Sequence, residues 1–391
     1  MDNWKKCKLG DICSKVTSGG TPLTSNALYY NGIIPWLNTK EVKNCRIYET
    51  EKYISQLGLE NSSAKWIEAN SVIIAMYGAT AGKVAINKIP LTTNQACCNL
   101  TINHEKADYN FIYYLILNNF ETLEILATGA AQQNLNLNTI TSLEITLPPL
   151  EEQRQIAAIL SSIDDKIELL HEQNKTLEEL AQTLFRHYFI ENPNPSWQEK
   201  PLKDVCVILN GYAFKSKEYS QNGTKIVRTT NFKNGFIDNK DVIYIDNLEN
   251  QYDKYLLRKN DFLLVMVGAS LGNYVVVTSN VLPALQNQNM WNFRALEGIS
   301  QHYLNYALRD IVKESIYGAS GSAREFFQKN QFYEKNILVP SFEIMNNFEE
   351  EISEFYDKLN ENLEQIQTLE NMRDILIPKL LNGEIKVGGN Q

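Results

Sequence analysis

Two glycine-rich segments are the first candidates for chemistry in this 391-residue chain. One runs Gly78-Ala79-Thr80-Ala81-Gly82-Lys83, and a second, at 268–273, runs Gly-Ala-Ser-Leu-Gly-Asn. A phosphate-binding loop needs four residues between its glycines and a Ser or Thr after the lysine to hold magnesium. Here three residues separate the glycines, Val84 follows the lysine, and Asn273 replaces that lysine in the second segment. We interpret both segments as glycine bends at strand ends.

Other candidates for catalysis and metal binding fail on their spacing or their flanks. Leu147-Pro148-Pro149-Leu150 lacks the polar and aromatic flanks with which an amino-methyltransferase holds a flipped base. The six cysteines include no Cys-x-x-Cys pair and the four histidines lie far from them, so reduced, mostly buried thiols are expected rather than a zinc site. Asp164-Asp165 falls in an acidic block and is interpreted as a solvated pair. No catalytic residue, metal site or cofactor is predicted for this chain.

An internal repeat organises the whole sequence. Five anchors recur in the same order at offsets of 190 to 193 residues. They begin at Trp4 and Trp197, Met76 and Met266, Asn94 and Asn287, Gly129 and Gly321, and Leu147 and Val339. Because the order is kept and the drift is small, the chain is predicted to be a duplicated unit.

Each repeat begins with a segment that mixes strands and helices. The apolar runs at 71–76 and 262–267 suit buried strands, and helical patches follow near 113–126 and 303–312. The sequence therefore predicts two α+β domains, at 1–150 and 191–342.

Each repeat ends in a predicted long helix, at 151–190 and, with a short tail, at 343–391. Apolar residues recur in alternating steps of 4 and 3, as in a coiled coil, and Asn174 interrupts the first series. We expect the two helices to pair; the alternative is that each packs on a separate domain. The predicted seam comprises Ile156, Leu160, Ile163, Ile167, Leu170, Leu177 and Leu184 with Ile352, Phe355, Leu359, Ile366, Leu369 and Leu376.

The net charge of −9 is unevenly distributed. The helical blocks 151–191 and 343–391 carry −5 and −7, whereas 1–150 is neutral and 192–342 carries +3. Phosphate contacts need Lys and Arg, so the domains can bind nucleic acid although the whole chain is acidic. No apolar run approaches the ~20 residues of a membrane span, and no secretory signal is visible, so a cytoplasmic location is expected.

Taken together, these features resemble the specificity subunits of type I restriction–modification enzymes, over essentially the whole chain. The resemblance is carried by Lys8–Ile12 with Ser18–Pro22, by Ile34–Lys40, Gly129–Gln132 and Leu147–Gln153, and by the closing segment Ile377–Ile385. It implies two α+β target-recognition domains separated by two long antiparallel coiled-coil helices. It also implies a non-catalytic subunit that reads a bipartite DNA target. Two methyltransferase subunits would dock on the helices and two ATP-driven restriction subunits would join them, and S-adenosylmethionine, ATP and Mg would belong to these partners.

DNA contacts are expected in two regions at equivalent places of the repeats. Base edges are read by Arg, Lys, Asn and Gln, while Ser and Thr suit phosphates. Asn38 of the first repeat corresponds to Arg228 of the second, and Gln132 corresponds to Arg324. Since amide side chains suit adenine and Arg suits guanine, the two domains should prefer different half-sites. The predicted DNA-binding residues are Asn38, Thr39, Lys40, Gln132, Gln133, Asn134, Lys215, Lys217, Lys225, Arg228, Thr229, Asn231, Arg324 and Lys329.

Two alternatives remain open at this point. The chain could serve a related methyltransferase–nuclease system as its recognition subunit. It could instead be a scaffold that binds protein through its helices and does not bind DNA.

Overall fold

The computed structural model describes residues 3–119, 135–191, 193–233, 235–246, 250–319 and 326–387. The chain divides into two compact units: unit 1 comprises residues 1–167 and 369–391, and unit 2 comprises residues 168–368. Each unit contains one mixed α/β domain and a part of each long helix. The prediction of domain boundaries at 150, 190 and 342 stays a prediction.

The domain of unit 1 is built on three sheets within its described residues. Their strand orders are β2-β10-β7-β8-β4, β5-β3-β9-β6 and β1-β11. The strands are β1 Lys5–Lys8, β2 Cys13–Ser18, β3 Tyr30–Leu37, β4 Cys45–Ile47, β5 Tyr53–Ile54, β6 Trp66–Ile67, β7 Val72–Ala75, β8 Val84–Asn87, β9 Leu91–Thr93, β10 Cys97–Ile102 and β11 Glu144–Leu147. The short helices are α1 Gln56–Glu60, α2 Tyr109–Asn118 and α4 Leu137–Thr141.

The domain of unit 2 repeats this plan. Its described sheets have the orders β13-β22-β19-β20, β14-β18-β15-β21, β12-β23 and β16-β17. The strands are β12 Gln198–Pro201, β13 Cys206–Asn210, β14 Tyr219–Ser220, β15 Thr224–Val227, β16 Phe232–Lys233, β17 Phe236–Ile237, β18 Ile243–Ile245, β19 Phe262–Val265, β20 Tyr274–Val276, β21 Ala284–Gln286, β22 Met290–Ala295 and β23 Asn336–Val339. The helices are α6 Gln301–Ala319 and α7 Lys329–Tyr333.

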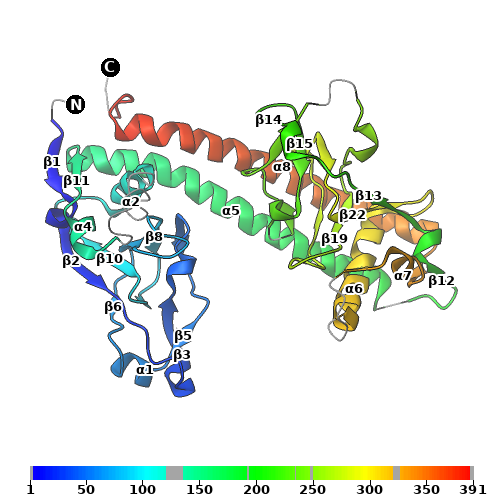
Figure 1. The fold of residues 1–391 in the computed structure, drawn as a ribbon, viewed down its shortest axis with the longest axis horizontal. Helices are drawn as coiled ribbons and strands as arrows, with labels where there is room; N and C mark the ends of the chain where they lie inside the picture. The colour runs from blue at the N-terminus through cyan, green and yellow to red at the C-terminus, as the bar shows by residue number, and fades with distance from the viewer. Residues whose placement is uncertain are drawn as a thin grey trace. The chain divides into compact units, whose positions relative to one another are not determined.

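Two helices of 40 residues each, α5 (Leu150–Phe189) and α8 (Phe342–Leu381), are related by an offset of 192. In Figure 1, α5 is the long green helix and α8 is the long helix that runs from orange to red. The side chain of Gln153 ties the start of α5 to the preceding proline, donating to the carbonyl of Pro148 at 2.9 Å. After α8, Gly383 has a φ of 73°, a left-handed backbone conformation that suits a glycine just beyond a helix end.

Both long helices complete the core of each unit. In unit 1 the core includes Ile156, Ala157 and Leu160 of α5 and Ile377, Leu380 and Leu381 of α8. In unit 2 it includes Ala181, Phe185 and Phe189 of α5 and Met345, Phe348, Ile352 and Tyr356 of α8. The start of α5 thus lies with the end of α8, and the reverse holds in unit 2, so the helices are antiparallel. Each fully buried apolar side chain contributes about 1.5–3 kcal/mol.

The predicted seam is buried over most of its length. The buried members are Ile156, Leu160, Ile163, Ile167, Leu170, Ile352, Leu359 and Ile366, and the half-buried members are Leu177, Leu184, Phe355, Leu369 and Leu376. In the second half of α5 the predicted seam members Leu177 and Leu184 are only half-buried, whereas Phe185 and Phe189, which the heptad pattern did not select, are buried. The reason is that this stretch packs on the domain as well as on α8, so one strict heptad series does not describe it.

Two polar predictions about the helices need correction. Asn174 does not merely interrupt the seam: it is buried, and its Oδ1 accepts a hydrogen bond from Asn362 at 2.9 Å. The interpretation of Asp164-Asp165 as a solvated pair was wrong for Asp164, which is largely buried, whereas Asp165 is exposed. Asp164 is paired with Arg373, and Asp165 is paired with Arg46.

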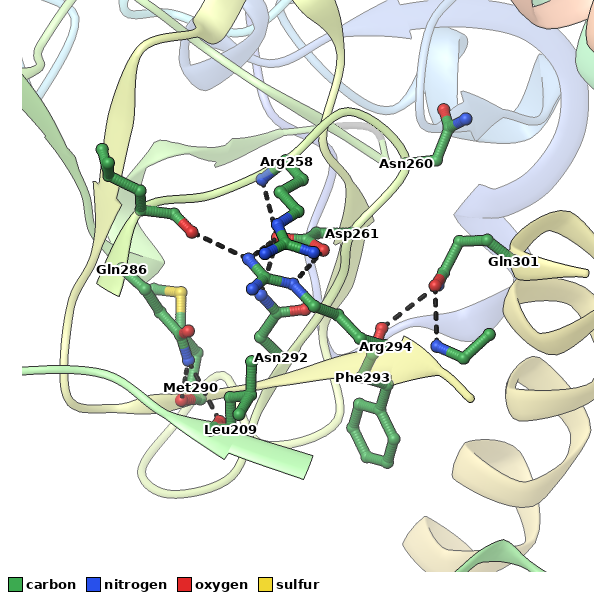
Figure 2. A network of polar contacts seen from close by, with 12 residues as sticks. Leu209, Arg258, Asn260, Asp261, Gln286, Met290, Asn292, Phe293, Arg294 and Gln301 are labelled. Carbon is green, nitrogen blue, oxygen red and sulfur yellow. Dashed lines mark hydrogen bonds and ion pairs between the residues drawn. The ribbon is translucent and has the colours of Figure 1, made fainter. Parts of the chain in front are cut away.

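A buried ion pair in unit 2 occupies a place that is uncharged in unit 1 (Figure 2). Asp261, 3% exposed, accepts from Nε and Nη2 of Arg294, both at 2.7 Å, and from Asn292. The strand offsets place Ser71 and Thr101 at the equivalent positions, and their hydroxyls lie 3.5 Å apart. The two repeats therefore place different polar side chains at equivalent positions of a similar backbone.

The exchange of these pairs is testable. Asp261→Ser alone leaves the Arg294 guanidinium without its carboxylate, and should lower the free energy of unfolding of unit 2 by about 3–5 kcal/mol. Asp261→Ser with Arg294→Thr installs the pair of unit 1 and should recover most of that loss. Urea unfolding followed by circular dichroism measures both, and a double variant as unstable as the single one would contradict this account.

Candidate nucleic-acid interface

A tight turn follows the end of β3 in unit 1. Asn38 caps a single 3₁₀ turn, Thr39–Glu41, and its side chain accepts from the backbone N–H of Lys40 at 3.1 Å. Glu41 returns the bond by accepting from the N–H of Asn38 at 2.9 Å. This reciprocal capping holds the backbone of the turn in one shape.

Thr39 anchors the turn to two neighbouring segments. Its buried hydroxyl donates to Oδ1 of Asn94 at 2.7 Å, and its carbonyl accepts from the hydroxyl of Thr80 at 2.8 Å. Asn94 follows β9, and Thr80 lies in the glycine bend between β7 and β8. Three loops therefore meet at one edge of the domain, and they position the exposed Lys40 and the half-buried Asn38.

The two glycine-rich segments are bends at strand ends, as the sequence predicted, and each joins two antiparallel strands. Gly78 and Gly82 have φ values of 88° and 82°, and Gly268 and Gly272 have 87° and 85°, a backbone region that favours glycine. In each bend the second glycine donates to the strand before the turn. Each bend is followed by a strand and not by a helix, so neither bend has the helix N-terminus that a phosphate-binding loop requires.

Unit 2 has an equivalent turn with a different cap. Arg228 precedes the 3₁₀ turn Thr229–Asn231 and donates its N–H to the side chain of Asn231 at 2.9 Å. Nη2 of Arg228 donates to the carbonyl of Asp241 at 2.8 Å, and this hydrogen bond restrains the position of the guanidinium. Val227 before this turn pairs in parallel with Gln286, as Leu37 pairs with Thr93 in unit 1.

The structure sorts the remaining predicted residues by exposure. Thr39 and Asn231 are buried and hydrogen-bonded inside their turns, so they hold the turns in place, and their predicted contact with DNA stays a prediction. Lys215 and Lys217 are exposed and Thr229 is half-buried. Lys225 donates to the carbonyl of Asn280 at 3.2 Å, and burial lowers its pKa, so it is partly engaged within the domain.

The second predicted region is described only in part. Gln132, Gln133, Asn134 and Arg324 lie outside the described residues, and their roles stay predictions. Lys329, the first residue of α7, lies over the ring of Tyr333 at 5.7 Å from its centroid, and burial lowers its pKa.

Sequence reasoning missed the residues that hold these turns in place. Thr80 and Asn94 are the partners of Thr39. In unit 2 the strand partner of Val227 is Gln286, whose side chain donates to the carbonyls of Leu209 and Met290, at 3.3 and 2.9 Å (Figure 2). The recurrence of Asn94-Gln95 in both repeats was the available signal, and it marked the repeat rather than a contact.

The described ranges contain neither a metal-binding cluster nor a membrane-spanning helix. No group of three or more His, Cys, Asp or Glu side chains there could hold a metal ion. Within the same residues, no helix has the length and apolar character needed to cross a membrane. The cysteines are free: Cys97, Cys98 and Cys206 are buried and the other three are half-buried.

Comparisons with known proteins agree with this architecture. The family model for the type I restriction modification DNA specificity domain matches residues 1–179 and 194–372. The chain is 29% identical to the type I restriction enzyme MjaIX specificity subunit of Methanocaldococcus jannaschii, covering 98% of this chain and 94% of that one. It is 30% identical to the Escherichia coli EcoR124I/EcoR124II specificity subunit over 47% of this chain and 46% of that one. The crystal structure of a type I S subunit from M. genitalium has the same fold, with a TM-score of 0.61, 18% identity and coverage of 97% and 96%.

The anchoring role of Thr39 gives a direct test. Thr39→Val keeps the volume but removes the hydroxyl, and should lower the free energy of unfolding of unit 1 by about 1 kcal/mol. Thr39→Ser keeps the hydroxyl and should stay near wild type. Thermal unfolding of both variants measures the difference. A Thr39→Val variant of unchanged stability but weakened nucleic-acid binding would instead support a direct contact.

Proposed function

This chain belongs to the family of type I restriction–modification DNA specificity domains, and on this premise we propose that it reads an asymmetric, two-part DNA target for a type I complex. In this proposal each unit reads one half-site, and the bases between the half-sites are unspecified. The chain itself catalyses no reaction.

The observation that carries the proposal is the pair of equivalent turns with different polar residues. Asn38 and Arg228 both precede a capped 3₁₀ turn at the end of a strand that is paired in parallel. An amide side chain pairs well with adenine and a guanidinium with guanine. Two readers of different chemistry on the same backbone require different half-sites, and therefore an asymmetric target rather than a palindrome.

The basic side chains of unit 2 supply contacts to phosphate. Lys217 lies in a 3₁₀ turn and Lys215 immediately precedes that turn. Both side chains are exposed, so their positive charge can attract the DNA backbone. Such contacts fix position and orientation but carry no sequence information. The exposed Lys40 in unit 1 is paired with Glu51 at 2.5 Å and would exchange this exposed partner for a phosphate.

The long helices supply the docking surface for two methyltransferase subunits. Leu180 of α5 and Met372 of α8 lie at equivalent positions of the repeat, and they are 48% and 47% exposed. Equivalent apolar positions on the two helices suit two copies of the same partner. Restriction subunits would join the complex, and S-adenosylmethionine, ATP and Mg would be bound by the partner subunits.

The test is to express this chain with its methyltransferase subunit in a host that lacks DNA modification, then to map modified bases by long-read sequencing. One asymmetric motif, split by an unspecified spacer, is expected. Arg228→Ala should weaken selection at one half-site by about 1–3 kcal/mol per base contact and leave the other half-site unchanged.

A matched control is Lys203→Ala, which removes an exposed positive charge from a different turn of unit 2. It should leave the motif unaltered. Unmodified DNA in the presence of a soluble complex of the two proteins would reject the proposal and favour a scaffold that does not bind DNA.

A further inference from the structure

A polar cluster joins the domain of unit 1 to both long helices. Asp164 of α5 accepts from the hydroxyl of Tyr114 in α2 at 2.6 Å and from Nη1 of Arg373 in α8 at 3.0 Å. The side chains of Asp164 and Arg373 are only 13% and 20% exposed. The adjacent Asp165 pairs with Arg46 of β4. The domain, its own long helix and the other long helix therefore meet at one largely buried carboxylate, and we name this group the unit 1 cluster.

Unit 2 contains a corresponding group, the unit 2 cluster. The hydroxyl of Tyr306 in α6 lies 3.2 Å from the hydroxyl of Tyr356 in α8. Arg309, in the next turn of α6, pairs with Glu178 of α5, and its guanidinium carbon lies 4.0 Å from the centroid of the Tyr306 ring. The hydroxyl of Tyr306 also contacts Glu178 at 3.4 Å. Again a domain helix and both long helices meet at one polar point.

The two clusters share two equivalent positions but distribute their charges differently over the helices. The offset of 192 that relates α5 to α8 also relates Tyr114 to Tyr306 and Asp164 to Tyr356. In each cluster one member comes from the other long helix, and it is a cation in unit 1 and an anion in unit 2. The same junction has thus kept a polar contact in both repeats although its chemistry differs.

Polar contacts constrain these junctions more tightly than apolar packing does. An apolar seam tolerates a small rotation of one helix against its neighbour, whereas charge-assisted hydrogen bonds lose strength quickly as their geometry departs from linear. Separating a buried ion pair also leaves a charge without compensation, which is costly. Burial and the neighbouring Asp164 raise the pKa of Tyr114, so its phenol stays protonated and able to donate.

We propose that the two clusters are positioning devices, each of which holds its domain at one rotational setting on the helix pair. Together they fix the spacer length that the protein accepts between its two half-sites. This inference rests on the proposed function, because it requires a split target. The cluster residues act through the domains that they hold, so their loss should change which spacer is accepted without changing the half-sites.

The experiment uses the full chain with its methyltransferase subunit and maps methylated sites by spacer length. Asp164→Asn with Arg373→Met removes both charges together and so avoids leaving one of them unpaired. Methylation at sites whose spacer is one base pair longer or shorter should rise about tenfold relative to the preferred spacer, because a setting that was disfavoured by about 1.4 kcal/mol becomes accessible. Glu178→Gln with Arg309→Met should act in the same way through unit 2.

Two controls and one graded variant separate positioning from general damage. Lys358→Met removes an exposed charge from α8 and should keep the wild-type spacer. Arg373→Lys retains the cation and should also keep it. Tyr114→Phe removes a single hydroxyl, is expected to fold, and should relax the spacer to a smaller extent. Circular dichroism during thermal unfolding checks that each variant is folded.

The outcomes are distinct. Relaxed spacing with unchanged half-sites supports the inference. Strict wild-type spacing in folded double variants overturns it, as does an equal loss at all spacers in binding assays with duplexes of different spacer length. If the wild-type complex itself yields no split motif, the proposed function fails instead.

Discussion

The burial of the apolar faces of α5 and α8 is the constraint on which the rest of this structure depends. A helix of 40 residues cannot keep such a face in water, and neither domain closes its core without residues from both helices. The start of α5 and the end of α8 belong to the core of unit 1, and the remaining halves belong to the core of unit 2. The helix pair is therefore part of each domain rather than a linker attached to it.

On this framework the two repeats have diverged in their polar residues while their backbones have stayed alike. Asn38 and Arg228 precede equivalent 3₁₀ turns with different caps, and the hydroxyl pair of Ser71 and Thr101 in unit 1 is replaced by the ion pair of Asp261 and Arg294 in unit 2. A buried polar side chain can be replaced when its hydrogen-bond partner changes with it, because the loss of stability comes from leaving a buried polar group unpaired. In the proposed function, this separation of backbone from polar chemistry is what allows one fold to read two different sequences.

Much of the fold could be predicted from the sequence because its signals were repeated. The anchors, the glycine bends and the long apolar series each occur twice, and the structure confirms the duplicated α+β plan and the antiparallel helices. The burial of Phe185 and the pairings of Asp164 could not be predicted, because both depend on residues far away in the chain. The same holds for Thr39: residue type suggested a DNA contact, whereas only the fold shows its hydroxyl bonded to Asn94.

The claim that each unit reads its own half-site is tested most directly by hydroxyl-radical footprinting of the complex on its mapped target. Two protected blocks separated by a weakly protected spacer are expected for the wild-type protein. Arg228→Ala should weaken protection in one block and leave the other intact, since the two turns lie in separate units. A single continuous protected block, or equal weakening of both blocks by this one substitution, would contradict the account.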